Sequence, residues 1–274
     1  MTTTDRPLMD NGEQQILHMW YEVADHLSDL MLNVLRSIGE MLRTDKMSYA
    51  KIALACLIAK SRLDYLAMIS LCKSDQCGPA RILARVVMDS CITALYIGKN
   101  PLVRGEQFWQ HEFQQRVDLG KKADNLTPLP SNNLAKLAEW QKFIYAFEGS
   151  NKKHGRLTWP NVGDMILDLD LDIDIVNLLS ATNKGFSFEV HALPLILVNM
   201  FVEYHGETVR VSPEPREADR VTHVFVSSLL LYLTLQLARN AFDLSIDDPL
   251  ATIHATLEEI DKENAKIQNS ATES

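Results

Sequence analysis

The sequence predicts an all-α protein, a single bundle of about nine or ten helices. Apolar residues recur at spacings of three and four along almost the whole chain, which is the period of an amphipathic helix. The 274 residues, 46% of them apolar, can bury a large core without disulfides or metals. No repeat or low-complexity linker divides the chain. We therefore expect one domain over 13–266, between a disordered N-terminus at 1–12 and a disordered tail at 267–274.

Breaker residues give the boundaries of the helices in the first half. Pro79 suits the first turn of a helix, and the Lys99-Asn100-Pro101 run ends one. The proline-bearing loop at 127–130 separates the next two, and Ser131 or Asn132 can cap the second of them. The helices expected here span 13–43, 48–73, 79–98, 102–122 and 131–147.

The second half contains one ambiguous segment. Residues 167–174 alternate between apolar residues and aspartate, which is a strand signal, but aspartate is poor in strands and no partner strand is evident. We favour a short helix, a turn and another short helix within 164–180. After these we expect a helix over 187–204, a loop with a short extended stretch over 207–216, and helices over 218–242 and 249–266.

Charge and hydropathy restrict the location and the partners. The net charge of −9 argues against a broad nucleic-acid or anionic-membrane surface, although a small basic cleft stays compatible with nucleic acid. The most apolar run, 224–238, is short for a bilayer span and indicates a core helix. The polar first twelve residues do not resemble a signal peptide. We expect a cytoplasmic protein without a membrane partner.

No metal or cofactor is expected. The cysteines are Cys56, Cys72, Cys77 and Cys91, and neither a C-x2-C pair nor a histidine pair completes a zinc pattern, so we expect buried, reduced thiols. The aspartate-rich segment at 167–174, called the aspartate run below, lacks the glycine and the closing glutamate of a calcium loop. Nucleotide-binding loops and the common hydrolase motifs are absent.

A narrow polar stripe crosses the otherwise apolar helix at 79–98. Arg81, Arg85 and Asp89 are spaced four apart and therefore lie on one face. One interpretation is a partly buried ion pair that fixes the packing of this helix. The other is an anion-binding arginine held by its aspartate.

A second polar pair lies on the apolar segment at 187–204. Ser187 and His191 share a face if the helix is continuous, and Pro194 should kink it nearby. His191 is either a hydrogen-bonded core histidine or a general base or ligand contact.

The densest basic cluster is at 152–156 and comprises Lys152, Lys153, His154 and Arg156, with Trp159 just after it. A solvated loop is the ordinary interpretation, and contact with phosphate or nucleic acid is the alternative. Trp159 would then stack on a base, or else anchor the loop by packing.

Three of these segments together resemble a known family. They are 81–89, which ends in R-x3-D, Thr158-Trp159-Pro160 with the short helix after it, and S-x2-V-H at 187–191. Their order is similar to that of an uncharacterised helical family of bacteria and archaea, a domain of unknown function, over about 54–204. Its members carry R-x3-E, so Asp89 here shortens the reach of the carboxylate. The resemblance implies a candidate site of Arg85, Asp89, Trp159, Ser187 and His191.

Two functional hypotheses follow. The first is a helical module that binds a protein partner or a small anion, in a bacterial stress or phage-defence system. The second is a metal-independent nuclease or a nucleotide-directed enzyme, with His191 as base and Arg85 steadying phosphate. The helical character suggests a distant likeness to HEPN-type ribonucleases, whose R-x4-6-H motif is matched at Arg104–His111 and Arg216–His223, as chance alone would allow. Apolar faces on 13–43 and 224–238 also favour a homodimer.

Overall fold

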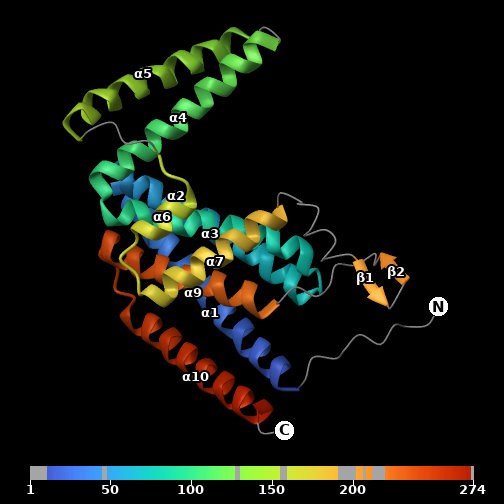
Figure 1. The fold of residues 1–274 in the computed structure, drawn as a ribbon. Helices are drawn as coiled ribbons and strands as arrows, with labels where there is room; N and C mark the ends of the chain where they lie inside the picture. Colours follow the sequence, from blue (N-terminus) through green and yellow to red (C-terminus); the bar gives the residue numbers. More distant parts are fainter. Residues whose placement is uncertain are drawn as a thin grey trace.

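The computed structural model describes residues 11–44, 48–126, 130–154, 159–190, 202–205, 208–211 and 220–272. These residues form helices and one two-stranded hairpin (Figure 1), so the predicted all-α class is confirmed. The helices are α1 (Asn11–Thr44), α2 (Tyr49–Lys73), α3 (Cys77–Lys99), α4 (Pro101–Leu126), α5 (Ser131–His154), α6 (Val162–Asp168), α7 (Ile173–Val190), α9 (Arg220–Phe242) and α10 (Asp247–Thr272). The strands are β1 (Val202–His205) and β2 (Thr208–Val211).

The core lies where α3 packs against both α2 and α9, and α1 packs against α9 and α2 as well. Each of these helices contributes fully buried apolar side chains, for example Leu27, Ile58, Ile92 and Leu231. Helix α10 packs along α1 at the edge of the bundle, as Figure 1 shows. Burial of this apolar surface is the main source of stability, and it matches the helical periodicity of the sequence.

Among the described residues, one helix is long and apolar enough to cross a membrane, Val221–Phe242 of α9. In its most apolar stretch, 56% of the residues are buried inside the protein. Core helices of globular proteins have the same composition. The packing of α9 on α1, α2 and α3 agrees with the core position expected for 224–238.

Helices α4 and α5 form an antiparallel pair that projects from the bundle (Figure 1). The start of α4 packs on α2, where a Cβ added to Gly105 would lie 2.6–2.9 Å from backbone and Cβ atoms of Ala50. Farther out, Val117 and Ile144 are buried between the two helices. Because Gly105 has no Cβ, α4 can approach α2 closely, and this contact joins the α4–α5 arm to the core.

Several helices are longer than predicted. Helix α5 continues through Gly149 to His154, where a basic loop was expected. Helix α7 runs unbroken to Val190, where two separate helices were expected. One glycine inside a helix costs only about 1 kcal/mol, which packing overrides, and basic residues suit a helix C-terminus. Helix α10 likewise extends to Thr272, beyond the expected end at 266.

The prediction of a helix through 204 is wrong at its end, because Val202–His205 is a strand. It pairs antiparallel with β2, and Val202 lies opposite Val211 and Tyr204 opposite Val209. β-Branched and aromatic residues favour such cross-strand pairs. The extended stretch expected within 207–216 is confirmed at β2. Pro194 and its expected kink lie outside the described residues.

Candidate functional site

The Arg85 guanidinium on α3 connects three acceptors from two helices. Its Nε donates to Oδ2 of Asp89 at 3.2 Å, one turn along α3. Its Nη1 donates to the backbone oxygen of Asn183 on α7 at 2.9 Å and also to the Oδ1 of that residue. No acceptor for Nη2 occurs among the described residues. The side chain is 17% exposed, so two of the five guanidinium donors stay available in a site that water can reach.

Only one carboxylate oxygen of Asp89, Oδ2, accepts a hydrogen bond from the described residues. Its Oδ1 lies 3.0 Å from the Arg85 Nε, an ion-pair distance, but it accepts no hydrogen bond with good geometry from the described residues. Burial raises the pKa of the Asp89 carboxyl, and the charge and hydrogen bond of Arg85 oppose that rise. The carboxylate therefore orients the arginine while remaining the less well stabilised member of the pair.

Helix α7 runs antiparallel to α3. Asp170, just before α7, contacts Lys99 at the end of α3, and Asn183, farther along α7, contacts Arg85. Ser187 is four residues beyond Asn183 and so lies on the same helical face, one turn closer to Arg81. The structure thus brings Arg85, Asp89 and Asn183 together, whereas the side chain of Ser187 is outside the described part of the chain. His191 lies outside the described residues.

Arg81, also on α3, contacts a third helix, α9. Its Nε donates to Nε2 of His223 on α9 at 3.1 Å, and His223 is only 3% exposed. A histidine nitrogen that accepts a hydrogen bond carries no proton, so this ring holds its proton on Nδ1. The polar stripe of α3 therefore serves contacts with α7 and α9, as expected for a stripe with tertiary partners.

Trp159 belongs to a different cluster. Its ring contacts Tyr96, Phe108 and His111 at centroid distances of 5.5–6.0 Å. Tyr96 is eleven residues beyond Arg85 on α3, about 16 Å along the helix. Trp159 thus packs the start of α6 onto α3 and α4, and it does not join the Arg85 site.

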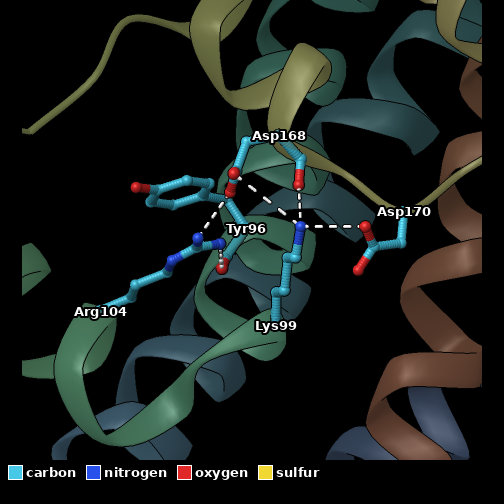
Figure 2. A network of polar contacts seen from close by, with 5 residues as sticks. All are labelled: Tyr96, Lys99, Arg104, Asp168 and Asp170. Carbon is cyan, nitrogen blue, oxygen red and sulfur yellow. Dashed lines mark hydrogen bonds and ion pairs between the residues drawn. The ribbon is translucent and has the colours of Figure 1, made fainter.

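The aspartate run also has local partners, which Figure 2 shows. The Arg104 Nη2 lies 2.5 Å from Asp168 Oδ2, and its guanidinium covers the Tyr96 ring at 3.8 Å. Lys99 donates to the backbone oxygen of Asp168 and contacts the Asp170 carboxylate at 3.1 Å. Farther on, Asp172 accepts from the backbone of Asp174 at the start of α7. The run therefore fixes the turn between α6 and α7, which confirms the predicted helix–turn–helix.

The remaining candidates are placed only in part. Lys153 and His154 are in the last turn of α5, and their side chains are not described. Arg156 lies outside the described residues, as does Arg216 of the second R-x6-H match. In the first match, Arg104 is held by Asp168 and by the Tyr96 carbonyl oxygen.

Within the described part of the chain, no group of three or more His, Cys, Asp or Glu residues is arranged to hold a metal ion. Of the described cysteines, Cys72 and Cys91 are buried, as predicted, whereas Cys56 is exposed. Burial raises the pKa of the Cys91 thiol to about 11, which leaves it protonated and unreactive at neutral pH.

Sequence reasoning did not select Asn183. A signal for it exists, because Asn183, Ser187 and His191 follow one another at four-residue spacing. The predicted elements ended at 180 and began again at 187, so Asn183 was not placed on any helix. The amide is the residue that ties the arginine of α3 to α7.

The fold and site define a helical bundle whose α3–α7 seam carries a partly exposed arginine. Comparison with protein families gives a match over residues 51–207 to a family of unknown function, DUF5677. This match covers more than half of the chain, so the protein belongs to the DUF5677 family, and the suspected resemblance is confirmed. The matched range contains Arg85, Asp89, Trp159 and Asn183, whereas α1, α9 and α10 lie outside it. No curated protein and no solved structure matches the chain.

Proposed function

We propose that this protein is a helical binding module that takes an anionic group, from a small anion or from a partner protein, at Arg85. The supporting observation is that the Arg85 guanidinium is already oriented while part of it remains available for binding. It is oriented by Asp89 and Asn183, it has no acceptor for Nη2 among the described residues, and it is 17% exposed. A pre-oriented arginine binds carboxylate or phosphate with little further loss of side-chain freedom.

The position of the site between two helices gives binding a structural consequence. An anion on Nη2 would add charge-assisted hydrogen bonds beside the Arg85–Asn183 contact that joins α3 to α7. Ligand binding should therefore tighten the α3–α7 seam and raise the melting temperature.

The test uses inorganic phosphate as the probe. Phosphate should shift the arginine Nε–Hε signal of Arg85 in a nitrogen-15 spectrum and raise the melting temperature of the wild type. Arg85→Lys should lose both effects, because an ammonium cannot present the same fork of donors. Arg239→Lys is the matched control, since Arg239 forms an exposed ion pair with Asp247 elsewhere on the bundle. Equal responses in both variants contradict the proposal.

The same samples address the other prediction, a metal-independent ribonuclease. Incubation with single-stranded RNA in the presence of a chelator should leave the RNA intact. RNA cleavage that is lost in both Arg85→Lys and His191→Ala would favour the nuclease instead. The homodimer, the cytoplasmic location and the role in stress or defence stay predictions.

A further inference from the structure

A cavity of about 610 Å³ beside α9 contains none of the residues of the Arg85 site. It is lined by Trp20 of α1, Ile175 of α7 and side chains of α9 and α10. The contribution of α9 consists of Val221, Thr222, Phe225, Leu229, Tyr232 and Leu233. All six of these side chains are only partly buried, so the cavity is open to solvent along α9. We call it the α9 groove.

The groove is elongated along the helix. Phe225, Leu229 and Leu233 are four residues apart and form one apolar stripe. From Val221 to Leu233 the lining extends over about three turns, or about 18 Å along the axis of α9. The apolar side chains of an amphipathic helix recur at the same spacing and occupy grooves of this kind.

The charged part of the lining is acidic. The polar lining residues are Thr222, Tyr232, His254, Glu258 and Asp261, and no lysine or arginine is among the described residues that line the groove. Glu258 and Asp261 are exposed on α10. Glu258 lies 3.4 Å from His254 and 4.0 Å from Lys262, whereas Asp261 has no cationic partner in the described part of the chain. The groove therefore combines an apolar stripe with a negatively charged edge.

This charge distinguishes between possible occupants. Two copies of the chain packed groove to groove would bring Glu258 and Asp261 close to their own symmetry mates, and like charges repel. An anionic membrane surface is disfavoured by the same edge and by the net charge of −9. A segment that carries lysine or arginine beside its apolar face is attracted instead.

From these observations we propose that the α9 groove docks a basic amphipathic helix of a partner protein. The apolar side chains of this helix enter the groove between the stripe of α9 and Leu257 of α10, and its cations lie against Glu258 and Asp261. Docking does not involve Arg85, so this proposal and the anion-binding proposal fail or succeed separately.

The probe is a labelled leucine–lysine peptide of about 14 residues, or four turns, with leucine at helical spacing. One control peptide has glutamate in place of every lysine, and another has the same composition in an order that leaves no apolar face. Fluorescence anisotropy with the full chain should show binding of the probe. Both control peptides should bind at least about tenfold more weakly, because each lacks either the charge or the apolar face.

A substitution in the stripe locates the binding. Leu229→Arg removes an apolar contact and places a cation in the groove, so it should weaken binding of the probe at least about tenfold. Leu63→Arg is the matched control, because Leu63 is a leucine of α2 that is 65% exposed and does not line the groove. It should leave the affinity unchanged. Circular dichroism checks that both variants are folded.

A pair of double variants tests the acidic edge. Glu258→Gln with Asp261→Asn should weaken binding several-fold at low ionic strength and less at high ionic strength, because salt screens exposed charges. Glu40→Gln with Glu139→Gln removes the same net charge from exposed positions on α1 and α5. Glu40 is twenty residues beyond Trp20, about 30 Å along α1, so this variant should bind the probe like the wild type. If Leu229→Arg does not fold, the comparison of these two double variants decides.

The proposal is overturned if the leucine–lysine peptide does not bind, if the glutamate peptide binds equally well, or if the groove variants bind the probe like their controls. It is also overturned if light scattering shows a wild-type dimer that Leu229→Arg converts into a monomer. The groove would then be a contact between two copies of this chain.

Discussion

Arg85 on α3 donates from Nη1 to the backbone carbonyl oxygen of Asn183 on α7, and the two atoms are 2.9 Å apart. Because a backbone carbonyl cannot be substituted away, this contact ties the position of α7 to the presence of the arginine. The same guanidinium is paired with Asp89, so one side chain supports helix packing and also retains a free edge.

Removal of this arginine should destabilise the fold moderately. Arg85→Ala leaves Asp89 and both acceptors of Asn183 without their donor, so we expect the free energy of unfolding to fall by about 1–3 kcal/mol. Removing one partner of a fully buried ion pair would lower the free energy of unfolding by about 3–5 kcal/mol. We expect a smaller loss here, because the Asp89 side chain is 41% exposed. Urea unfolding measures the difference.

Lys262→Ala provides the control for that experiment. It breaks the pair with Glu258 on α10, which has the same four-residue spacing but is more exposed. We expect a change of less than about 0.5 kcal/mol. Equal losses in the two variants would show that the contact with α7 contributes nothing.

Asp89 should give stability a pH dependence. Its pKa in the folded protein is raised above the ordinary value of 3.8, mainly by burial, so the folded state holds this proton more tightly than the unfolded chain does. Stability from this group is therefore present below pH 3.8 and is lost as the pH rises through the folded pKa. Asp89→Asn should remove this loss. Melting curves of the two proteins across this range should diverge as the pH rises, and parallel curves contradict the assignment.

Two glycines on different helices should respond oppositely to alanine. A Cβ at Gly105 would meet the backbone of Ala50 at 2.7 Å, which cannot move without shifting α2, so Gly105→Ala should destabilise by about 1–3 kcal/mol or more. At Gly39 on α1 nothing lies within 4 Å. There alanine should stabilise by about 0.5–1 kcal/mol, because it favours the helix. Thermal melts of both variants test the junction between the α4–α5 arm and the core.

A buried hydrogen bond should couple α2 to α9. The Tyr65 hydroxyl lies 2.6 Å from Ser228 Oγ, and both side chains are fully buried. Tyr65→Phe leaves the serine unsatisfied and should cost about 1–3 kcal/mol. The double variant Tyr65→Phe with Ser228→Ala should cost less than the sum of the single variants. Strict additivity in urea unfolding would mean that the two hydroxyls do not interact in solution.

The amino-acid sequence by itself determined the helical class and most of the helix positions. Apolar spacing predicted α1, α2 and α9 to within a few residues, and the poor strand propensity of aspartate predicted the turn between α6 and α7. The stripe of Arg81, Arg85 and Asp89 also followed from four-residue spacing. These features are local, since a helix and its faces depend on residues only a few positions apart.

Only the tertiary structure decided what the stripe contacts. Packing of α7 against α3 carried the helix past its expected break and placed Asn183 on Arg85, and pairing with β2 made 202–205 a strand. The cavity beside Trp20 likewise depends on four helices that are distant in the sequence. Such contacts join residues that are many turns apart in the chain. They depend on how side-chain volumes fit when the helices pack, and no local spacing encodes that fit.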